Sequence, residues 1–300
     1  MGNYTTTNNG KQDTPAFSGV ANNIDASDYH RSFGVTKSGL LMLHKSPAHY
    51  YHWLTSPPSE TTPAMSKGTA THTLLFEPQK WKDEITVIPL DAPKKATKAQ
   101  REAKKPSDDA VASMKWWDEF DKANEGKCII TAEDESNARA MVDAVLNHED
   151  VLPLLNHPSA KPEVSITAVE EIDGIQIPCK MRCDLLTEDG KTIVDLKTTI
   201  DSSQEAFGKS FFKMGYWMQA AHYIATARLA GIPVERFIFV AVESSQPHAV
   251  ALYTLDAKSL EKAFVIRQRL LKRLAECTAT GKFPAYAKGV NTLSMPPWFS

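Results

Sequence analysis

The sequence predicts one domain of the α/β or α+β class, in which a mixed central β-sheet is flanked by helices. Two observations support this prediction. Hydrophobic residues make up 42% of the 300 residues and charged residues 23%, a composition that allows a globular domain with a sizeable core. The hydrophobic pattern also changes from helical spacing to strict alternation after Pro162, so helices should precede a run of strands.

The first half of the sequence predicts an arm followed by helices. Residues 1–26 are rich in Thr, Asn, Gly and Ser and show no hydrophobic period, so we expect a disordered arm, with the domain occupying residues 27–300. Capping residues and helical spacing then predict helices over the following segments: 38–43 (capped by Thr36 or Ser38), 48–54, 64–76, 107–124 and 132–147.

The second half predicts the sheet and two more helices. Alternation of apolar and polar residues predicts these strands: 163–169, 175–186, 192–198, 236–243 and 249–255. The helices are expected over 205–230 and 257–280, the first of them ended by Gly231 and Pro233. The order of elements is helices, three strands, a helix, two strands and a helix, which is typical of a layered fold with a mixed sheet.

Charge and cysteine content narrow the function classes. The formal net charge of −2 argues against a protein that coats nucleic acid by bulk charge, although it permits cations confined to a groove. The four cysteines form no CxxC pair, which argues against zinc and indicates reduced thiols in a cytoplasmic protein. No apolar run is long enough to cross a membrane, and the absence of a P-loop motif argues against ATP hydrolysis.

One segment, residues 89–106, is rich in basic residues. A solvated surface is the more usual meaning of such a run, and a strip that contacts phosphates is the alternative. The basic residues are Lys94, Lys95, Lys98, Arg101, Lys104 and Lys105.

A hairpin over residues 181–197 carries the chemistry. Asp189-Gly190 lies between two β-rich runs and predicts a two-residue turn. This turn places Asp184 opposite Asp195, and side-chain alternation then directs Asp184, Asp195 and Lys197 to one face. The other face should be core and receives Met181, Cys183, Leu185, Val194 and Leu196.

Two directly opposed carboxylates, with Cβ atoms about 5 Å apart, repel each other unless a cation lies between them. A hard divalent cation such as Mg²⁺ prefers such oxygens, and it can polarise a phosphoryl oxygen and lower the pKa of a water. Lys197 is placed to orient or deprotonate that water, or to stabilise developing negative charge. A surface salt-bridge lattice of Asp184, Asp195, Arg182 and Lys197 is the plainer alternative, but it gives no reason to oppose two acids.

The spacing of Asp184 and Asp195-Leu196-Lys197 resembles the D…(D/E)xK signature of the PD-(D/E)xK nuclease superfamily. Three further features resemble its RecB-like branch: the GxxxH helix motif over Gly68-Thr69-Ala70-Thr71-His72, the acid Glu163 before the hairpin, and the QxxxY motif of Gln219 and Tyr223. Gln219 and Tyr223 are four residues apart and share a helix face. Core packing explains Tyr223 nearly as well as function does, whereas a buried Gln219 amide needs partners.

More closely, the chain resembles the nuclease domain of the RecE exonucleases. The matching phrases, in the family's order, are Tyr29-His30, Val35-Thr36-Lys37-Ser38, Lys45-Ser46-Pro47-Ala48-His49-Tyr50, Gly68 to Pro78, and Asp195-Leu196-Lys197-Thr198-Thr199. The resemblance implies a three-layer core, a ring-shaped tetramer around DNA, and Mg²⁺-dependent 5′-to-3′ digestion of one strand of linear duplex DNA. It also implies a RecT-type single-strand annealing protein as partner in phage recombination.

The resemblance also implies roles for single residues. Asp184 and Asp195 would ligate Mg²⁺ (Mn²⁺ is an option), with Asp195 replacing the usual glutamate, and Lys197 would assist the attacking water. His72 would lie beside the metal and Glu163 could complete a second metal site. Gln219 and Tyr223 would hold the scissile strand or the lysine. The cations expected to face DNA are Arg182, Lys209 and Lys213.

Three alternatives remain open. A RecB-like nuclease acting as an endonuclease, on flaps or on single strands would carry the same motif residues. A catalytically inactive DNA-binding relative is disfavoured by the intact motif set, because a decayed site usually loses its lysine or an acid. A metal-dependent phosphohydrolase for nucleotides is the third.

Overall fold

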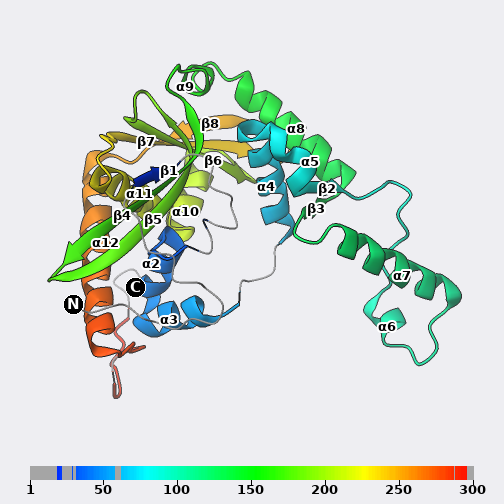
Figure 1. Cartoon of the computed structure of the whole chain (residues 1–300), viewed down its shortest axis with the longest axis horizontal. Helices are drawn as coiled ribbons and strands as arrows, with labels where there is room; N and C mark the ends of the chain where they lie inside the picture. The colour runs from blue at the N-terminus through cyan, green and yellow to red at the C-terminus, as the bar shows by residue number, and fades with distance from the viewer. Residues whose placement is uncertain (1–18, 22–28, 30–31, 58–61, 287, 296–300) are drawn as a thin grey trace.

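The centre of the fold is a six-stranded mixed sheet, seen in a computed structural model that describes residues 19–21, 29, 32–57, 62–286 and 288–295 (Figure 1). Every neighbouring pair is antiparallel except β6 and β7, which are parallel. The strands, in spatial order, are β1 (Gly19–Ala21), β4 (Lys161–Ile172), β5 (Ile175–Thr187), β6 (Thr192–Thr199), β7 (Arg236–Glu243) and β8 (Val250–Tyr253). The predicted mixed sheet with flanking helices is therefore confirmed.

Three apolar clusters hold the helices to the sheet. On one face, α4 (Pro63–Phe76) and α8 (Ala132–Leu146) pack on β6 and β7 through Ala70, Leu196 and Val240. The other face packs against α10 (Gln204–Lys213) and α11 (Tyr216–Leu229). A third cluster joins α2 (Lys37–Lys45), α3 (Pro47–Thr55) and α12 (Ala257–Thr280) to the far end of β5.

The amino-terminal region departs from its prediction in one place. Gly19–Ala21 lies within the expected disordered arm, yet it pairs as β1 with residues 165–167 of β4. The backbone groups of an edge strand are free to pair with a further strand, which gives such a segment a place to order. The rest of the arm lies outside the described residues. The expected first helix is α2, and its cap is Thr36, whose hydroxyl accepts from Gly39 N at 3.2 Å.

The helix predicted over 205–230 is wrong as a single helix. Gly215 has a φ of 67° and separates α10 from α11. A Cβ at this position would lie 2.4 Å from the Leu41 side chain, so only glycine fits the conformation and the close approach of α2. The break matters because α11 then begins at Tyr216 and presents its first turns to the hairpin.

The hairpin turn is confirmed. Lys191 N donates to Glu188 O at 3.1 Å, and the two central residues, Asp189 and Gly190, have φ of 56° and 86°. Glu188 also has a positive φ, of 55°, so three successive residues of the turn adopt the left-handed conformation. The register Leu185↔Val194 and Thr187↔Thr192 is the predicted one, but the pairing of β5 with β6 stops at Leu185, one residue short of Asp184.

The prediction that one hairpin face is core and the other carries the site is wrong. Met181 and Cys183 pack towards α11, while Leu185, two residues along, packs towards α4 and α8. Strict alternation is therefore interrupted at Asp184. Across from it on β4, Glu163 has a φ of 50°, and the β4–β5 pairs resume on both sides of it. Both faces of the sheet are covered, and the site lies where the strands part.

An arm projects beyond α4. A small parallel sheet of β2 (Ile85–Val87) and β3 (Cys128–Ile130) packs against α4, and the chain between these two strands forms α6 (Lys98–Arg101) and α7 (Asp108–Ala123), which extend away from the body (Figure 1). The short elements η1 (Pro78–Lys80), α5 (Trp81–Glu84) and α9 (Leu152–Leu155) complete the chain. The helices predicted over 107–124 and 132–147 are confirmed as α7 and α8. Among the helices of the described ranges, none is long and apolar enough to cross a membrane.

Candidate metal centre and active site

Three of the four predicted metal ligands meet where β5 leaves β6. His72 comes from α4, Glu163 from β4 and Asp184 from β5, and each offers a ligand atom within 4.8 Å of the other two. Their positions follow from local structure: the capped helix α4 presents His72, and the positive φ of Glu163 turns its side chain out of the ladder. Within the described part of the chain, this is the one group of three or more such side chains close enough to hold a metal.

His72 is oriented by a backbone carbonyl. Its Nε2 lies 3.1 Å from Leu196 O, so this nitrogen carries the proton and donates. The lone pair then belongs to Nδ1, which faces Asp184 Oδ2 at 3.4 Å. Burial lowers the pKa of His72, and the Lys197 cation lowers it further, so the ring is neutral. A neutral imidazole with its other nitrogen donated to a carbonyl is the usual form of a metal-ligating histidine.

The two acids of this group are electrostatically strained. Burial raises the pKa of Asp184, and the nearby Asp195 carboxylate adds to the effect, although Leu196 N donates to Asp184 Oδ2 at 2.7 Å. Burial also raises the pKa of Glu163, to about 7, with the Asp184 charge as the next cause. Both carboxylates therefore resist holding a negative charge in the protein alone.

A divalent cation fits this group. The Nδ1 lone pair of His72 and the oxygens of Glu163 and Asp184 are all electron-pair donors that face one another. A cation among them would turn mutual repulsion into coordination. Carboxylate oxygens suit Mg²⁺ and Mn²⁺, while an imidazole nitrogen shifts the preference towards transition metals.

Asp195, the fourth predicted ligand, faces a different partner set. It is 1% exposed, its Oδ1 accepts from Gln219 Nε2 at 2.5 Å, and its Oδ2 forms an ion pair with Lys197. The metal role expected for Asp195 stays a prediction. Gln219 is buried, and this contact supplies the partner that its amide needs.

Lys197 is a partly buried cation, with 17% of its side chain exposed. Burial favours its neutral amine, but the carboxylates of Asp195 and Asp184 favour the ammonium more, so the pKa of Lys197 is raised. Its Nζ also lies 4.9 Å from the centre of the Tyr216 ring. A lysine held in its charged form suits the stabilisation of negative charge better than proton abstraction.

Lys37 is a site residue that the sequence analysis did not single out. It is the first residue of α2, and its Nζ lies 5.3 Å from the centre of the same Tyr216 ring. Burial lowers the pKa of Lys37 to about 8, with Lys197 as the next cause. The sequence signal was its place in the phrase that resembles the RecE nucleases, but only the fold brings α2 beside α11.

The remaining candidates are less central. Arg182 Nε donates to Glu163 at 2.6 Å, and its guanidinium lies 3.6 Å from Glu77. Its contacts therefore hold the Glu163 carboxylate in place. The DNA contact expected for it stays a prediction. The ring of Tyr223 packs 6.0 Å from Phe237, and burial raises its pKa, with charges at Asp195 and Asp184 among the further causes. The last two, Lys209 and Lys213, are exposed on α10.

Comparison with known proteins places the chain in a family by its sequence. The sequence pattern of the family described as "PDDEXK-like domain of unknown function (DUF3799)" matches residues 36–296. A protein from Eubacterium rectale, proposed to be an exonuclease, has a similar fold with a TM-score of 0.55 at 12% identity, over 92% of this chain and 96% of that one. A phage-related exonuclease from Haemophilus somnus matches 62% of this chain and 91% of its own at 14% identity, but its TM-score of 0.27 supports no argument. No curated protein matches the sequence.

Proposed function

Because the chain belongs to this family of PDDEXK-like domains, we propose that it is a metal-dependent nuclease that hydrolyses phosphodiester bonds of DNA. The single observation that supports the proposal is that His72, Glu163 and Asp184 lie together beside the ion pair of Lys197 with the buried Asp195. Such a set of metal donors next to a fixed cation suits a reaction in which negative charge develops on phosphoryl oxygens.

A divalent cation held by His72, Glu163 and Asp184 would polarise a phosphoryl oxygen and make a water molecule a stronger nucleophile at neutral pH. The protein side chains do the rest. Lys197 stays protonated at Nζ and stabilises the charge that develops on the phosphoryl group. Gln219 holds Asp195, and Asp195 holds Lys197, so the ammonium is fixed before the substrate arrives.

A second lysine, Lys37, lies beside the same site. Lys37 and Lys197 approach one Tyr216 ring, while the ion pair of this cluster is that of Lys197 with Asp195. The positive charge of Lys37 therefore remains available to an anion. The phosphodiester next to the scissile bond is the anion that a nuclease brings to this position.

In its finer form, the proposal is digestion of one strand of linear duplex DNA from the 5′ end, with Mg²⁺ or Mn²⁺, by a ring-shaped assembly that works with a single-strand annealing protein. The direction, the assembly and the partner rest on the resemblance of the sequence to the RecE exonucleases. The site geometry itself suits hydrolysis of any DNA phosphodiester.

The test is digestion of linear duplex DNA labelled at the 5′ or the 3′ end, with Mg²⁺, Mn²⁺ or EDTA. We expect metal-dependent release of nucleotides from the 5′ end and no effect on closed circles. Lys197→Ala should lower the rate by about 10²- to 10³-fold, the usual cost of removing one group that stabilises the transition state. Lys272→Ala, at an exposed lysine of α12 that pairs with Asp173, is the matched control.

The other outcomes identify the alternatives. Cutting of closed circles would favour an endonuclease of the RecB-like branch. Failure to cleave any DNA while metal still binds would contradict the proposal and favour an inactive DNA-binding relative.

A further inference from the structure

The basic segment over residues 89–106, here called the basic strip, is not used by the catalytic centre. It contains six basic residues and two acidic ones, Asp91 and Glu102, so its formal net charge is +4 on a chain whose net charge is −2. The strip includes α6 and leads into α7, on the arm that projects from the body beside α4 (Figure 1). A concentration of one sign of charge on an ordered projection differs from the mixed charge of an ordinary solvated surface.

The strip is fixed to α7 by specific contacts. The indole Nε1 of Trp117 donates to Pro93 O at 2.8 Å, and the hydroxyl of Ser113 donates to Lys94 O at 2.7 Å. The Lys95 ammonium lies 4.2 Å from the centre of the Trp117 ring, a cation–π contact. The backbone that carries these cations is therefore ordered before any ligand binds, which lowers the entropy cost of binding.

Most cations of the strip have no acidic partner. Among the residues that the structure describes, ion pairing within the strip is limited to Lys98 with Glu102, at 3.8 Å on the surface. Four exposed cations carry no ion pair in that part of the chain: Lys94, Arg101, Lys104 and Lys105. Like charges gathered in this way repel one another, and a polyanion removes the repulsion.

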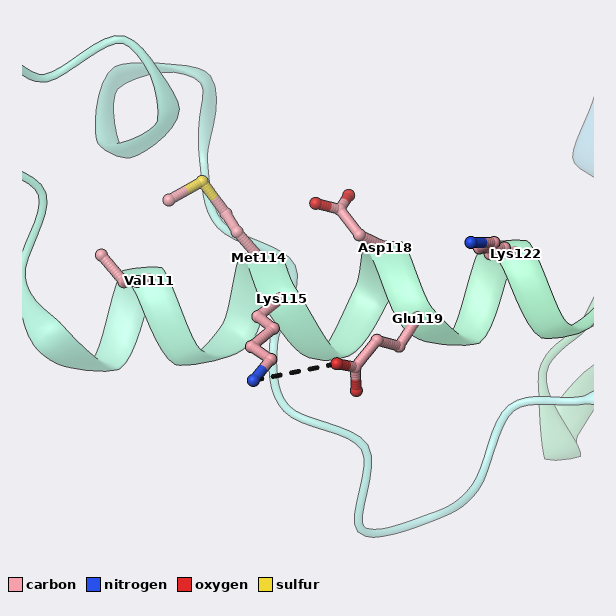
Figure 2. A pocket seen from close by; sticks show the side chains of 6 residues that line it. All are labelled: Val111, Met114, Lys115, Asp118, Glu119 and Lys122. Atoms are coloured by element: carbon pink, nitrogen blue, oxygen red, sulfur yellow. Dashed lines mark ion pairs between the residues drawn. The ribbon is translucent and has the colours of Figure 1, made fainter.

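The outer face of α7 gives the contrast within the same arm. There Lys115 pairs with Glu119 at 3.9 Å, and Asp118 and Lys122 lie on the same face, around a shallow hollow that includes Val111 and Met114 (Figure 2). Two lysines and two acids share this face, so its formal charge is zero.

We propose that the basic strip binds the phosphate backbone of duplex DNA outside the catalytic centre. The inference rests on the proposed function, because it takes duplex DNA as the substrate. The arm is rooted on β2 and β3, whose Ile85 and Ile130 pack with Ala70 and Phe76 of α4, the helix that carries His72. Phosphates held by the strip are thereby held at a fixed position relative to the metal-binding group.

The test is the salt dependence of binding to a short labelled duplex in EDTA, where no cleavage occurs. We expect the slope of log affinity against log salt to become less steep by up to about 0.9 for each phosphate contact removed. The variants are Lys104→Gln with Lys105→Gln, Lys94→Gln with Arg101→Gln, and all four changes together. The matched control is Lys115→Gln with Lys122→Gln, which removes two lysines from the charge-balanced face of the same arm (Figure 2).

Hydrolysis of a small phosphodiester, bis-p-nitrophenyl phosphate, with Mn²⁺ separates the two proposals, because this substrate reaches the catalytic centre without touching the strip. Strip variants should hydrolyse it at the wild-type rate while binding duplex more weakly. A wild type that hydrolyses neither substrate would overturn the proposed function. The salt dependence of duplex binding in EDTA would still test the strip proposal. Strip variants that bind duplex with the wild-type affinity and slope would overturn the strip proposal.

Discussion

His222 is buried and His72 is partly buried, and the two rings differ in what their second nitrogen meets. Each has Nε2 at a backbone carbonyl. At His222 the second nitrogen accepts from Arg267 Nε at 3.2 Å, and the Arg267 charge is balanced by Glu170 at 2.6 Å. At His72 the second nitrogen faces the carboxylate of Asp184 at 3.4 Å, so an acceptor meets an acceptor.

The difference separates a structural network from a functional one. Around His222, donors meet acceptors and cation meets anion, so the network is complete without a ligand. Around His72, burial and like charge raise the pKa values of Asp184 and Glu163 even beside Arg182 and Lys197, so this group gains from a bound proton or a further cation.

The largest expected effect is on activity, at the unsatisfied centre. Asp184→Asn keeps an oxygen that can accept from Leu196 N but removes a carboxylate of the proposed metal site, so DNA cleavage should fall by roughly 10²-fold or more. Thermal stability in EDTA should not fall, because the change removes a buried charge that lies near Asp195. End-labelled DNA digestion and thermal melting measure the two effects. Glu171→Gln, at an exposed acid of β4, is the control, and a large loss of stability in Asp184→Asn would contradict the comparison.

The second effect is on stability, at the satisfied network. Arg267 is 1% exposed, and Arg267→Met leaves Glu170 without its ion-pair partner, which should cost about 3–5 kcal/mol in the free energy of unfolding. Urea denaturation measures the loss. The double variant Arg267→Met with Glu170→Gln should recover part of the stability, because the uncompensated charge is gone. Cleavage per folded molecule should stay unchanged. A loss of cleavage without a loss of stability would contradict the structural role of the His222 network.

The third effect is on pH dependence. Burial, and then the Arg267 charge, lower the pKa of His222 to about 3 from an ordinary value of 6.5. The unfolded state therefore binds more protons than the folded state between these values, so stability rises with pH across this window and is lost as pH falls below about 6.5. His222→Gln can keep a donor for the Val35 carbonyl and an acceptor for Arg267 but does not titrate. Between pH 7 and pH 5 the wild type should lose about 2 kcal/mol more than His222→Gln in urea denaturation, and parallel curves would contradict the assignment.

The sequence predicted the hairpin because its information is local. Turn chemistry at Asp189-Gly190 sets the register, and burial of apolar side chains confirms it. The same reasoning failed at Asp184, because strict alternation assumes continuous pairing, and the place where β5 leaves β6 is set by α4 and by the backbone of Glu163. The hairpin motif was therefore predictable, and the opening that makes it a site was not.

Two other features depended on contacts between distant segments. A lone glycine is tolerated within a helix, so Gly215 gave no reason to divide the predicted helix until the contact with Leu41 was known. Lys37 is far from Lys197 in the sequence, and only the packing of α2 beside α11 brings both to Tyr216. Local patterns predict elements and single residues, whereas which charges meet in space is decided by tertiary packing.

The smallest expected effect concerns the cations of the two networks, Arg267 beside His222 and Lys197 near His72. Arg267 is held by acceptors on several sides, whereas Lys197 is held by Asp195 and by the Tyr216 ring. Tyr216→Leu removes the ring, and a cation–π contact of this kind is worth about 1 kcal/mol, so cleavage should fall by about fivefold. Tyr216→Phe keeps the ring and is the matched control, with activity close to wild type.

The measurement for this pair is kcat and KM for cleavage of end-labelled duplex. A ring that only fills space would lower the melting temperature of Tyr216→Leu without changing kcat per folded molecule. A ring that fixes the Lys197 ammonium should lower kcat, because the cation then reaches the developing phosphoryl charge less often. If Tyr216→Phe lost as much activity as Tyr216→Leu, the hydroxyl and not the ring would be the group that matters, and Lys197 would depend on Asp195 alone.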